Sequence, residues 1–312
     1  MAKRRIIRNV LPILLGLFLV FFLAVVPWFI ANIITTARFH FRDPNDGKTP
    51  LSFGLPFQNI EFHSSDGILL KGWYVPAGPN PQGTIIYCHG HNRTRVEMLP
   101  MEVFGHRLGY NGLLFDFRHA GQSGGKIGTL GYQERLDAIA AVHYALDQKN
   151  AARPVVLWGV SMGAAAALMA ASETPQVAAV ISDSSFLSFR EVIVHHARLF
   201  FHLPSFPIVD EGIYWAAWRG GFKPSDFDLR KAVQGINPRP ILLVAVEGDK
   251  RMPPSIAREL YAQSTSPASA LVVVPGHRHG EGFNSGKAEY EQAVKKFLQS
   301  LQLAWHSPPP LR

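Results

Sequence analysis

The sequence has few residues that could cross-link the chain or bind metal through sulfur. It contains a single cysteine, Cys88, in 312 residues, so it can form neither an intramolecular disulfide nor a cysteine-based zinc site. Charged residues are also few, at 17%, against 47% hydrophobic residues. That balance excludes a disordered chain and supplies enough apolar surface for a large core.

A concentrated basic face is missing as well, although the net charge is +8. Lys3, Arg4, Arg5 and Arg8 provide four of these charges before the first apolar run begins. The remaining charge is spread over the rest of the chain, which is too little for a surface that binds nucleic acid. We therefore expect no nucleic-acid partner.

The longest apolar run covers residues 10–34, and no charged residue occurs between Arg8 and Arg38. As a helix it would be roughly 37 Å long, enough to cross a hydrocarbon core of about 30 Å. A cleaved signal peptide would have a shorter apolar region and a small-x-small cleavage site, and a buried soluble helix is the third alternative. We predict a retained single-pass anchor over residues 10–36, preceded by a basic flank over residues 1–9.

The orientation of this anchor follows from the charges that flank it. Four basic residues precede the run, and Arg38, Arg42 and Lys48 follow it. By the positive-inside rule this weak bias favours a cytoplasmic N-terminus and an extracytoplasmic location for the rest of the chain.

After a linker over residues 37–57, predicted strands and helices alternate along one domain, residues 58–303. This order predicts an α/β fold with a mostly parallel sheet, helices on both faces and an antiparallel hairpin at its start. Residues 186–237 interrupt the alternation and are rich in Phe, Trp, His and Pro, so we expect a small inserted cap there. Residues 304–312 are expected to form a disordered tail. The predicted strands cover residues 60–64, 68–75, 84–88, 113–117, 155–158, 177–181, 241–246 and 271–274, and the predicted helices cover residues 98–108, 131–148, 164–172, 256–263 and 287–301.

The pattern Gly-x-Ser-x-Gly occurs at residues 159–163 and again at residues 121–125. A nucleophile elbow needs a strand that runs directly into the turn and a helix that leaves it. Ser161 has both, since an apolar run precedes it and an alanine-rich helical segment follows. Ser123 has neither and is expected to be structural. The sequence therefore predicts Ser161 as a nucleophile.

A serine hydroxyl needs a histidine base that is oriented by a carboxylate. Asp249 follows the predicted strand 241–246 at its carboxyl end, and Asp183 is the alternative acid after the strand 177–181. His277 and His279 follow the last strand, and their spacing alone does not choose between them. A His-x-His metal pair is disfavoured because no acidic cluster accompanies it.

The strand 84–88 ends in His89-Gly90, a turn that can swing the backbone toward the predicted elbow. The backbone N–H groups of His91 and Met162 are then the expected donors to an oxyanion.

These motifs, together with Gly248-Asp249 and His279-Gly280, resemble the α/β-hydrolase superfamily over residues 58–302. Within it the chain resembles the membrane-anchored branch grouped with serine aminopeptidase-like and acyl-protein thioesterase-like hydrolases. The family's Arg-Gly-x-Gly loop appears here as Arg118-His119-Ala120-Gly121, which departs from the family pattern.

The resemblance favours His279 as the base. It implies hydrolysis of a carboxylic ester or thioester through an acyl-enzyme on Ser161, with Asp249 and His279 completing the triad and no metal or organic cofactor. The expected substrate is a small or lipid-like acyl compound, and the expected membrane contact is the N-terminal helix. The alternatives are a peptidase that cleaves an amide and a non-catalytic binding protein with the same fold.

Overall fold

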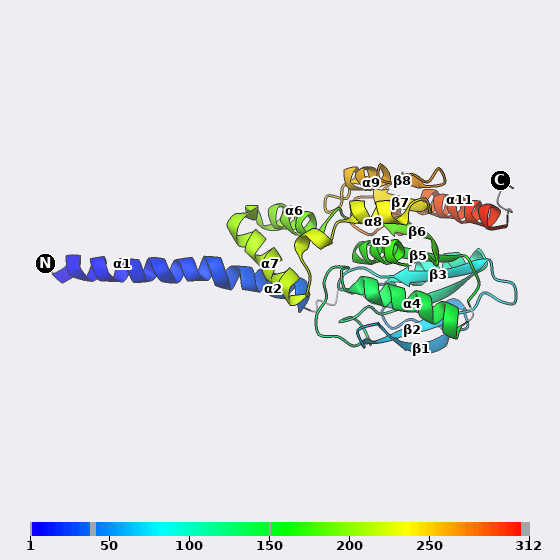
Figure 1. Ribbon diagram of the computed structural model, residues 1–312, viewed down its shortest axis with the longest axis horizontal. Coiled ribbons are helices and arrows are strands. Elements are labelled where there is room, and N and C mark those ends of the chain that lie inside the picture. The colour runs from blue at the N-terminus through cyan, green and yellow to red at the C-terminus, as the bar shows by residue number, and fades with distance from the viewer. Residues whose placement is uncertain (1, 38–41, 150, 307–312) are drawn as a thin grey trace. The chain divides into compact units, whose positions relative to one another are not determined.

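A computed structural model describes residues 2–37, 42–149 and 151–306 of the chain (Figure 1). It divides into two compact units. The helical unit combines the N-terminal helix with residues 188–227, and the sheet unit contains the rest.

The sheet unit is built on one eight-stranded sheet with the order β1-β2-β4-β3-β5-β6-β7-β8. The pairs β1–β2 and β2–β4 are antiparallel, and every other neighbouring pair is parallel. The strands are β1 (Gln58–His63), β2 (Leu69–Val75), β3 (Gly83–Cys88), β4 (Tyr110–Phe115), β5 (Val155–Val160), β6 (Val177–Asp183), β7 (Ile241–Val246) and β8 (Ala270–Val274). This arrangement confirms the predicted α/β fold with its mostly parallel sheet and leading hairpin.

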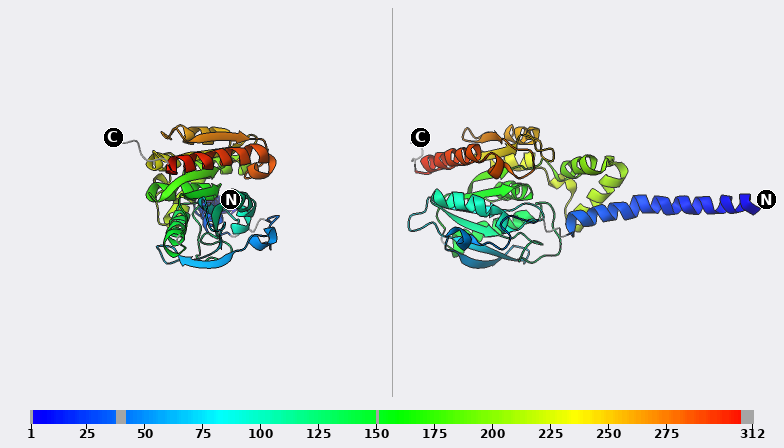
Figure 2. Two further views of the ribbon diagram at one scale, coloured as in Figure 1. Left: turned by 90° about the vertical axis from the view of Figure 1, so that its right-hand side faces the viewer. Right: turned by 180° about the vertical axis from the view of Figure 1, so that it is seen from behind.

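Helices cover both faces of the sheet. On one face, α3 (Leu99–Arg107) and α11 (Lys287–His306) share an apolar cluster with Val156, Trp158 and Val160 of β5. The right-hand view of Figure 2 looks toward this face of the sheet. On the other face, α5 (Met162–Glu173) packs on β5 and β6, flanked by α4 (Glu134–Gln148) and α8 (Leu229–Ile236) (Figure 1). Burial on both sides explains why the central strands are almost continuously apolar.

The predicted strand over residues 113–117 is displaced, because β4 begins at Tyr110 and ends at Phe115. A polar residue near its start hid the beginning of the strand: the side chain of Asn111 is buried and accepts the N–H of Ala77 at 2.9 Å. At the other end, the strand stops before Asp116, whose carboxylate accepts the N–H groups of Arg95 and Gln122.

The inserted segment contains helices that the sequence analysis did not assign. In the helical unit these are α6 (Phe189–Phe201), the π-helical turn η4 (Ser205–Val209), α7 (Asp210–Arg219) and the 3₁₀ turn η5 (Pro224–Asp226). Helix α6 begins where the Ser188 hydroxyl accepts the N–H of Glu191, an N-cap. Helix α8 lies within the residues 186–237 that we expected to form a cap, and by its contacts it groups with the sheet unit.

The N-terminal helix consists of α1 (Ala2–Val20), the π-helical turn η1 (Phe21–Val25) and α2 (Val26–Thr35). The π turn precedes Pro27, whose missing N–H is accommodated in the first turn of α2. The stretch Val10–Thr35 is long and apolar enough to cross a membrane by length and composition. Residues 38–41 of the predicted linker and residues 307–312 of the predicted tail lie outside the described residues, and α11 continues to His306.

A buried arginine ties three parts of the sheet unit together. The Arg118 guanidinium donates to Asp137 of α4 at 2.7 Å, to Asp66 at 2.6 Å and to Ser64 at 3.0 Å. Burial raises the pKa of Asp137 to about 6 against the opposing effect of Arg118, so its carboxylate is ionised at pH 7. The pair therefore fixes the β1–β2 turn and the loop after β4 to helix α4.

We expect Arg118→Met to lower the free energy of unfolding by about 3–5 kcal/mol, because it leaves the fully buried carboxylate of Asp137 without its cation. Chemical denaturation of the full chain in detergent would measure this. The control is Arg135→Met, which breaks the more exposed pair with Glu173 and should cost about 1 kcal/mol or less. A loss in Arg118→Met no larger than in the control would contradict the structural role.

Candidate active site

Ser161 occupies a sharp turn between β5 and α5, as the elbow prediction requires. Its backbone has φ 54° and ψ −115°, a left-handed conformation that is rare for a residue with a side chain. The turn is held by the Ser161 N–H, which donates to the carbonyl of Asp183 at 2.8 Å, and by the Ser161 carbonyl, which accepts the N–H of Ala165. The serine is thus strained but well fixed at the N-terminus of a helix.

The two glycines of the motif are required because strand and helix nearly touch. A Cβ atom at Gly163 would lie 2.0 Å from the carbonyl oxygen of Cys88, and one at Gly159 would lie 2.3 Å from the carbonyl oxygen of Gly163. Both contacts are with backbone atoms that cannot rotate away. The Gly-x-Ser-x-Gly spacing is therefore a packing requirement of this turn.

His279 connects this serine to an acidic residue through two hydrogen bonds. Its Nε2 lies 2.8 Å from Ser161 Oγ, and its Nδ1 lies 2.7 Å from Asp249 Oδ2. A neutral ring with its proton on Nδ1 satisfies both contacts, since Nδ1–H donates to the carboxylate and Nε2 accepts the serine hydroxyl.

The Asp249 carboxylate is held in its ionised form. Burial alone would raise the pKa of Asp249, but His279 and the N–H groups of Met252 and Arg251 outweigh it and bring this pKa below its usual value. These N–H groups donate to Oδ1 at 3.0 and 2.8 Å. The carboxylate is therefore available to orient the imidazole and to stabilise an imidazolium.

The side chains of the two alternative residues make other contacts. The carboxylate of Asp183 accepts hydrogen bonds from the hydroxyls of Tyr290 and Ser184, at 2.9 and 2.8 Å. His277 directs its backbone N–H to Glu281, while the ring beside Ser161 is that of His279. The geometry thus brings together Ser161, Asp249 and His279 from the three predicted strand ends.

The second Gly-x-Ser-x-Gly serine has a different environment. Ser123 is buried, its hydroxyl donates to the carbonyl of Asp116 at 2.6 Å, and its oxygen accepts the N–H of Lys71 at 3.0 Å. Both contacts are with backbone groups, one in β2 and one directly after β4. This serine holds a loop in place.

His91 and Met162, the expected oxyanion donors, both line a cavity of about 290 Å³ in the sheet unit. Burial lowers the pKa of His91 to about 4, so its ring is neutral at pH 7. The other lining residues include Asn92, Arg93 and His119. The cavity thus carries polar side chains and adjoins Met162, the residue that follows Ser161.

The turn that carries His91 is held by two residues whose role the sequence analysis did not identify. The buried ring of His89 accepts the N–H of Phe117 at 3.0 Å through Nε2, so Nδ1 bears the proton and donates to the Gly90 carbonyl at 2.8 Å. The carboxylate of Glu97 accepts the Gly90 N–H at 2.6 Å. Burial raises the pKa of Glu97 to about 7, although the Gly90 N–H and Arg93 act in the opposite direction. No sequence motif marks Glu97, because it acts through a backbone atom.

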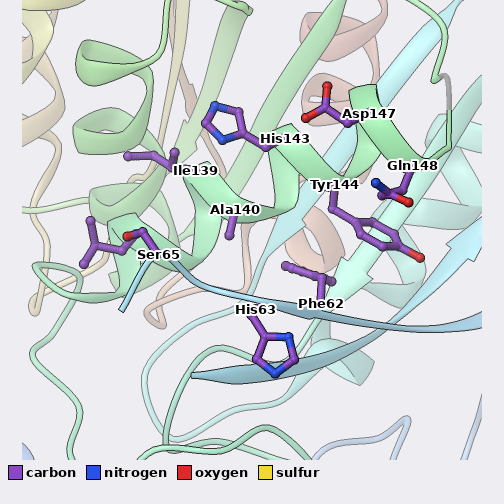
Figure 3. Close-up of a pocket in the computed structure, with 10 residues that line it drawn as sticks. Phe62, His63, Ser65, Ile139, Ala140, His143, Tyr144, Asp147 and Gln148 are labelled. Atoms are coloured by element: carbon purple, nitrogen blue, oxygen red, sulfur yellow. The ribbon is translucent and has the colours of Figure 1, made fainter. Parts of the chain in front are cut away.

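A second cavity, of about 310 Å³, lies between β1 and α4 (Figure 3). It is lined by Phe62 and His63 of β1 and by His143, Tyr144 and Asp147 of α4, among others, and Phe62 stacks on Tyr144. Among the described residues that line this cavity, no serine is hydrogen-bonded to a histidine. Within the part of the chain that the structure describes, no group of three or more His, Cys, Asp or Glu side chains is placed to hold a metal ion.

A serine on a strand–turn–helix elbow, set in a mostly parallel eight-stranded sheet, defines the α/β-hydrolase class. Two family sequence models match this chain: serine aminopeptidase S33 over residues 79–218 and TAP-like protein over residues 216–305. The chain belongs to the α/β-hydrolase superfamily.

Similar proteins are found in bacteria, yeast and archaea. The uncharacterized protein YqkD of Bacillus subtilis is 28% identical over 240 residues, which cover 76% of this chain and 78% of that protein. A yeast relative, the uncharacterized membrane protein YNL320W, is 25% identical and covers 76% of this chain and 78% of its own length. Among solved structures, the Pyrococcus furiosus esterase Pf2001 superposes with a TM-score of 0.71 at 24% identity, covering 85% of this chain and 98% of the esterase.

Proposed function

We propose that this protein is a serine hydrolase that cleaves a carboxylic ester or thioester through an acyl-enzyme on Ser161. The observation that carries the proposal is the continuous hydrogen-bonded path from Ser161 Oγ through His279 to Asp249. A serine hydroxyl in contact with a neutral, oriented imidazole is the arrangement that activates it as a nucleophile.

In the first half of the reaction, Ser161 Oγ attacks the substrate carbonyl carbon while His279 Nε2 takes the hydroxyl proton. The resulting imidazolium is stabilised by the ionised Asp249. When the carbon–oxygen or carbon–sulfur bond breaks, His279 returns the proton to the departing alcohol or thiol, and the acyl group remains on Ser161.

In the second half, His279 takes a proton from water as the water oxygen attacks the acyl carbon. The proton then returns to Ser161 Oγ and the carboxylic acid departs. In both halves the backbone N–H groups of His91 and Met162 donate to the tetrahedral oxyanion, and one such donor is worth about 3–4 kcal/mol. The hydrogen bonds of His89 and Glu97 would keep the first of these donors in position.

The acidic group that lines the cavity beside Met162 favours an ester or thioester over a peptide with a free N-terminus. A substrate ammonium group would need an uncommitted carboxylate, and among the described residues that line this cavity only Glu134 is acidic. Its two oxygens already accept hydrogen bonds from Thr129 and Gly131. That solved relatives such as Pf2001 are described as esterases supports the same choice.

The second candidate is an amide hydrolase, which the match to the serine aminopeptidase S33 family favours. A non-catalytic binding role would leave the serine–histidine contact without a purpose. Comparing turnover of a p-nitrophenyl ester series with that of aminoacyl p-nitroanilides separates the two hydrolases.

We further propose that residues 10–36 anchor the protein in a membrane, with the N-terminus cytoplasmic and the sheet unit extracytoplasmic. The length of the apolar stretch and a yeast relative named as a membrane protein support the anchor. The four basic residues before the stretch support the orientation.

Ser161→Ala should lower kcat/KM for a soluble p-nitrophenyl ester by about 10⁴-fold or more and abolish labelling by a fluorophosphonate probe, because the nucleophile is gone. Ser123→Ala is the matched control from the second motif. It should still be labelled, although it can lose stability. Labelling that persists in Ser161→Ala and vanishes in a folded Ser123→Ala would overturn the assignment.

His279→Ala should abolish turnover at pH 7, whereas His277→Ala should reduce kcat/KM by about tenfold or less. Of these two histidines, it is His279 whose ring contacts both Ser161 and Asp249. Asp249→Asn should be severe yet less complete, because His279 remains but loses its oriented tautomer. Activity in His279→Ala beside an inactive, folded His277→Ala would show that the base is His277.

A further inference from the structure

The helical unit exposes an unusual concentration of aromatic side chains. Phe206, Phe201 and Trp218 are 77%, 68% and 67% exposed. We call the full set the aromatic edge: Phe200, Phe201, Phe206, Tyr214, Trp215 and Trp218, from α6, η4 and α7. Large aromatic side chains gathered at a surface mark a site of interaction rather than scattered exposure.

Helix α7 has two opposite faces, and the aromatic edge occupies one of them. Tyr214, Trp215 and Trp218 are spaced so that they lie on a single side of the helix. The other side carries Gly212 and Ala216, both buried. Inside the unit α7 packs mainly against α2 and also contacts α6, η4 and η5, while its aromatic face stays exposed.

The main partner of α7 inside the unit is the N-terminal helix. A Cβ atom at Gly212 would lie 2.7 Å from the side chain of Ile30, so α7 and α2 are packed as closely as a glycine permits. Arg219 at the end of α7 donates to Asn32 at 2.7 Å and to Thr35 at 2.8 Å. The two helices thus form one body, with the polar contacts near the end of α2.

The turn between α6 and α7 reaches further along the same apolar helix. Turn η4, which carries Phe206, contacts both α2 and η1. Turn η1 covers Phe21–Val25 and lies inside the apolar stretch Val10–Thr35. Turn η4 is the tip of the helical hairpin that α6 and α7 form. This tip therefore lies beside side chains that a membrane would surround.

The depth of this tip follows from helix geometry. If hydrocarbon begins near Val10, about 20 residues at about 1.5 Å each cross its ~30 Å and end near Phe29. Turn η1 then lies about 6–12 Å inside that boundary, the usual depth of an interfacial element. The level of Gly212 falls at the boundary, so the exposed Glu211, one residue before it, lies at the boundary itself, and the residues after Gly212 lie on the headgroup side. Tyr214 and Trp215 lie at the level where amphipathic rings prefer to be.

We propose that the aromatic edge inserts into the lipid bilayer beside the N-terminal helix, so that the cap is a second membrane contact of this protein. The phenylalanines of the tip enter the acyl-chain boundary, and the tryptophans and the tyrosine of α7 lie among the headgroups. This proposal depends on the N-terminal helix being in a membrane, but it does not depend on the hydrolase activity.

Depth-dependent quenching in the full chain tests this contact. Phe206→Cys, Leu17→Cys and Ser225→Cys would each be labelled with an environment-sensitive fluorophore and reconstituted into phosphatidylcholine vesicles with brominated acyl chains. Leu17 is an exposed residue of the apolar stretch, and Ser225 is an exposed residue of η5 in the same helical unit. The native Cys88 is buried, and the unsubstituted protein controls for its labelling.

We expect quenching at position 206 to be within about twofold of that at position 17, and at least about threefold stronger than at position 225. Strong quenching at position 17 with quenching at position 206 no greater than at position 225 would overturn the cap contact while leaving the anchor in place. A fluorophore at position 206 that is shielded from water but not quenched by the lipids would mean that protein, such as a second copy, covers the edge. An unquenched position 17 would overturn both the anchor and the cap contact.

Discussion

The structure depends on one constraint, the forced approach of β5 and α5 around Ser161. The serine keeps a left-handed backbone because its N–H is fixed to Asp183 and because glycines on either side allow backbone contacts that no side chain would permit. The same approach sets the first turn of α5 against the end of β3. The same packing of β5 and α5 therefore positions both Ser161 and the end of β3, which precedes the His89-Gly90 turn.

The parallel sheet then brings the other groups to this point. Strands β3, β5, β7 and β8 all run in the same direction, so the residues that follow them gather at one edge. Asp249 and His279 come from the loops after β7 and β8. Buried polar contacts hold these loops, such as the two N–H groups that donate to Asp249. The rigidity of the sheet is what allows short hydrogen bonds between residues more than a hundred positions apart.

The sequence was sufficient to predict the fold and the residues at the strand ends, because both follow from local patterns. Apolar runs define the buried strands, and the positions of Ser161 and Asp249 follow from where those runs stop. The choice of His279 over His277 needed the family resemblance, since two alternate residues in a loop have no periodicity to separate them. The role of Glu97 was not predicted, because its side chain binds a backbone N–H and no motif marks such a contact. The packing of α7 on α2 was not predicted either, because no local pattern pairs segments about 180 residues apart. The start of β4 was missed because Asn111 is polar yet satisfied inside the sheet.

The most direct test of the account is to identify the residue that carries the acyl group during turnover. The full chain would be mixed with a p-nitrophenyl ester, quenched rapidly in acid and mapped by peptide mass spectrometry. The account predicts one acyl group, located on Ser161, and no such adduct in Ser161→Ala. Turnover with an unmodified Ser161, or an acyl group found on a different residue such as Ser123, would contradict it.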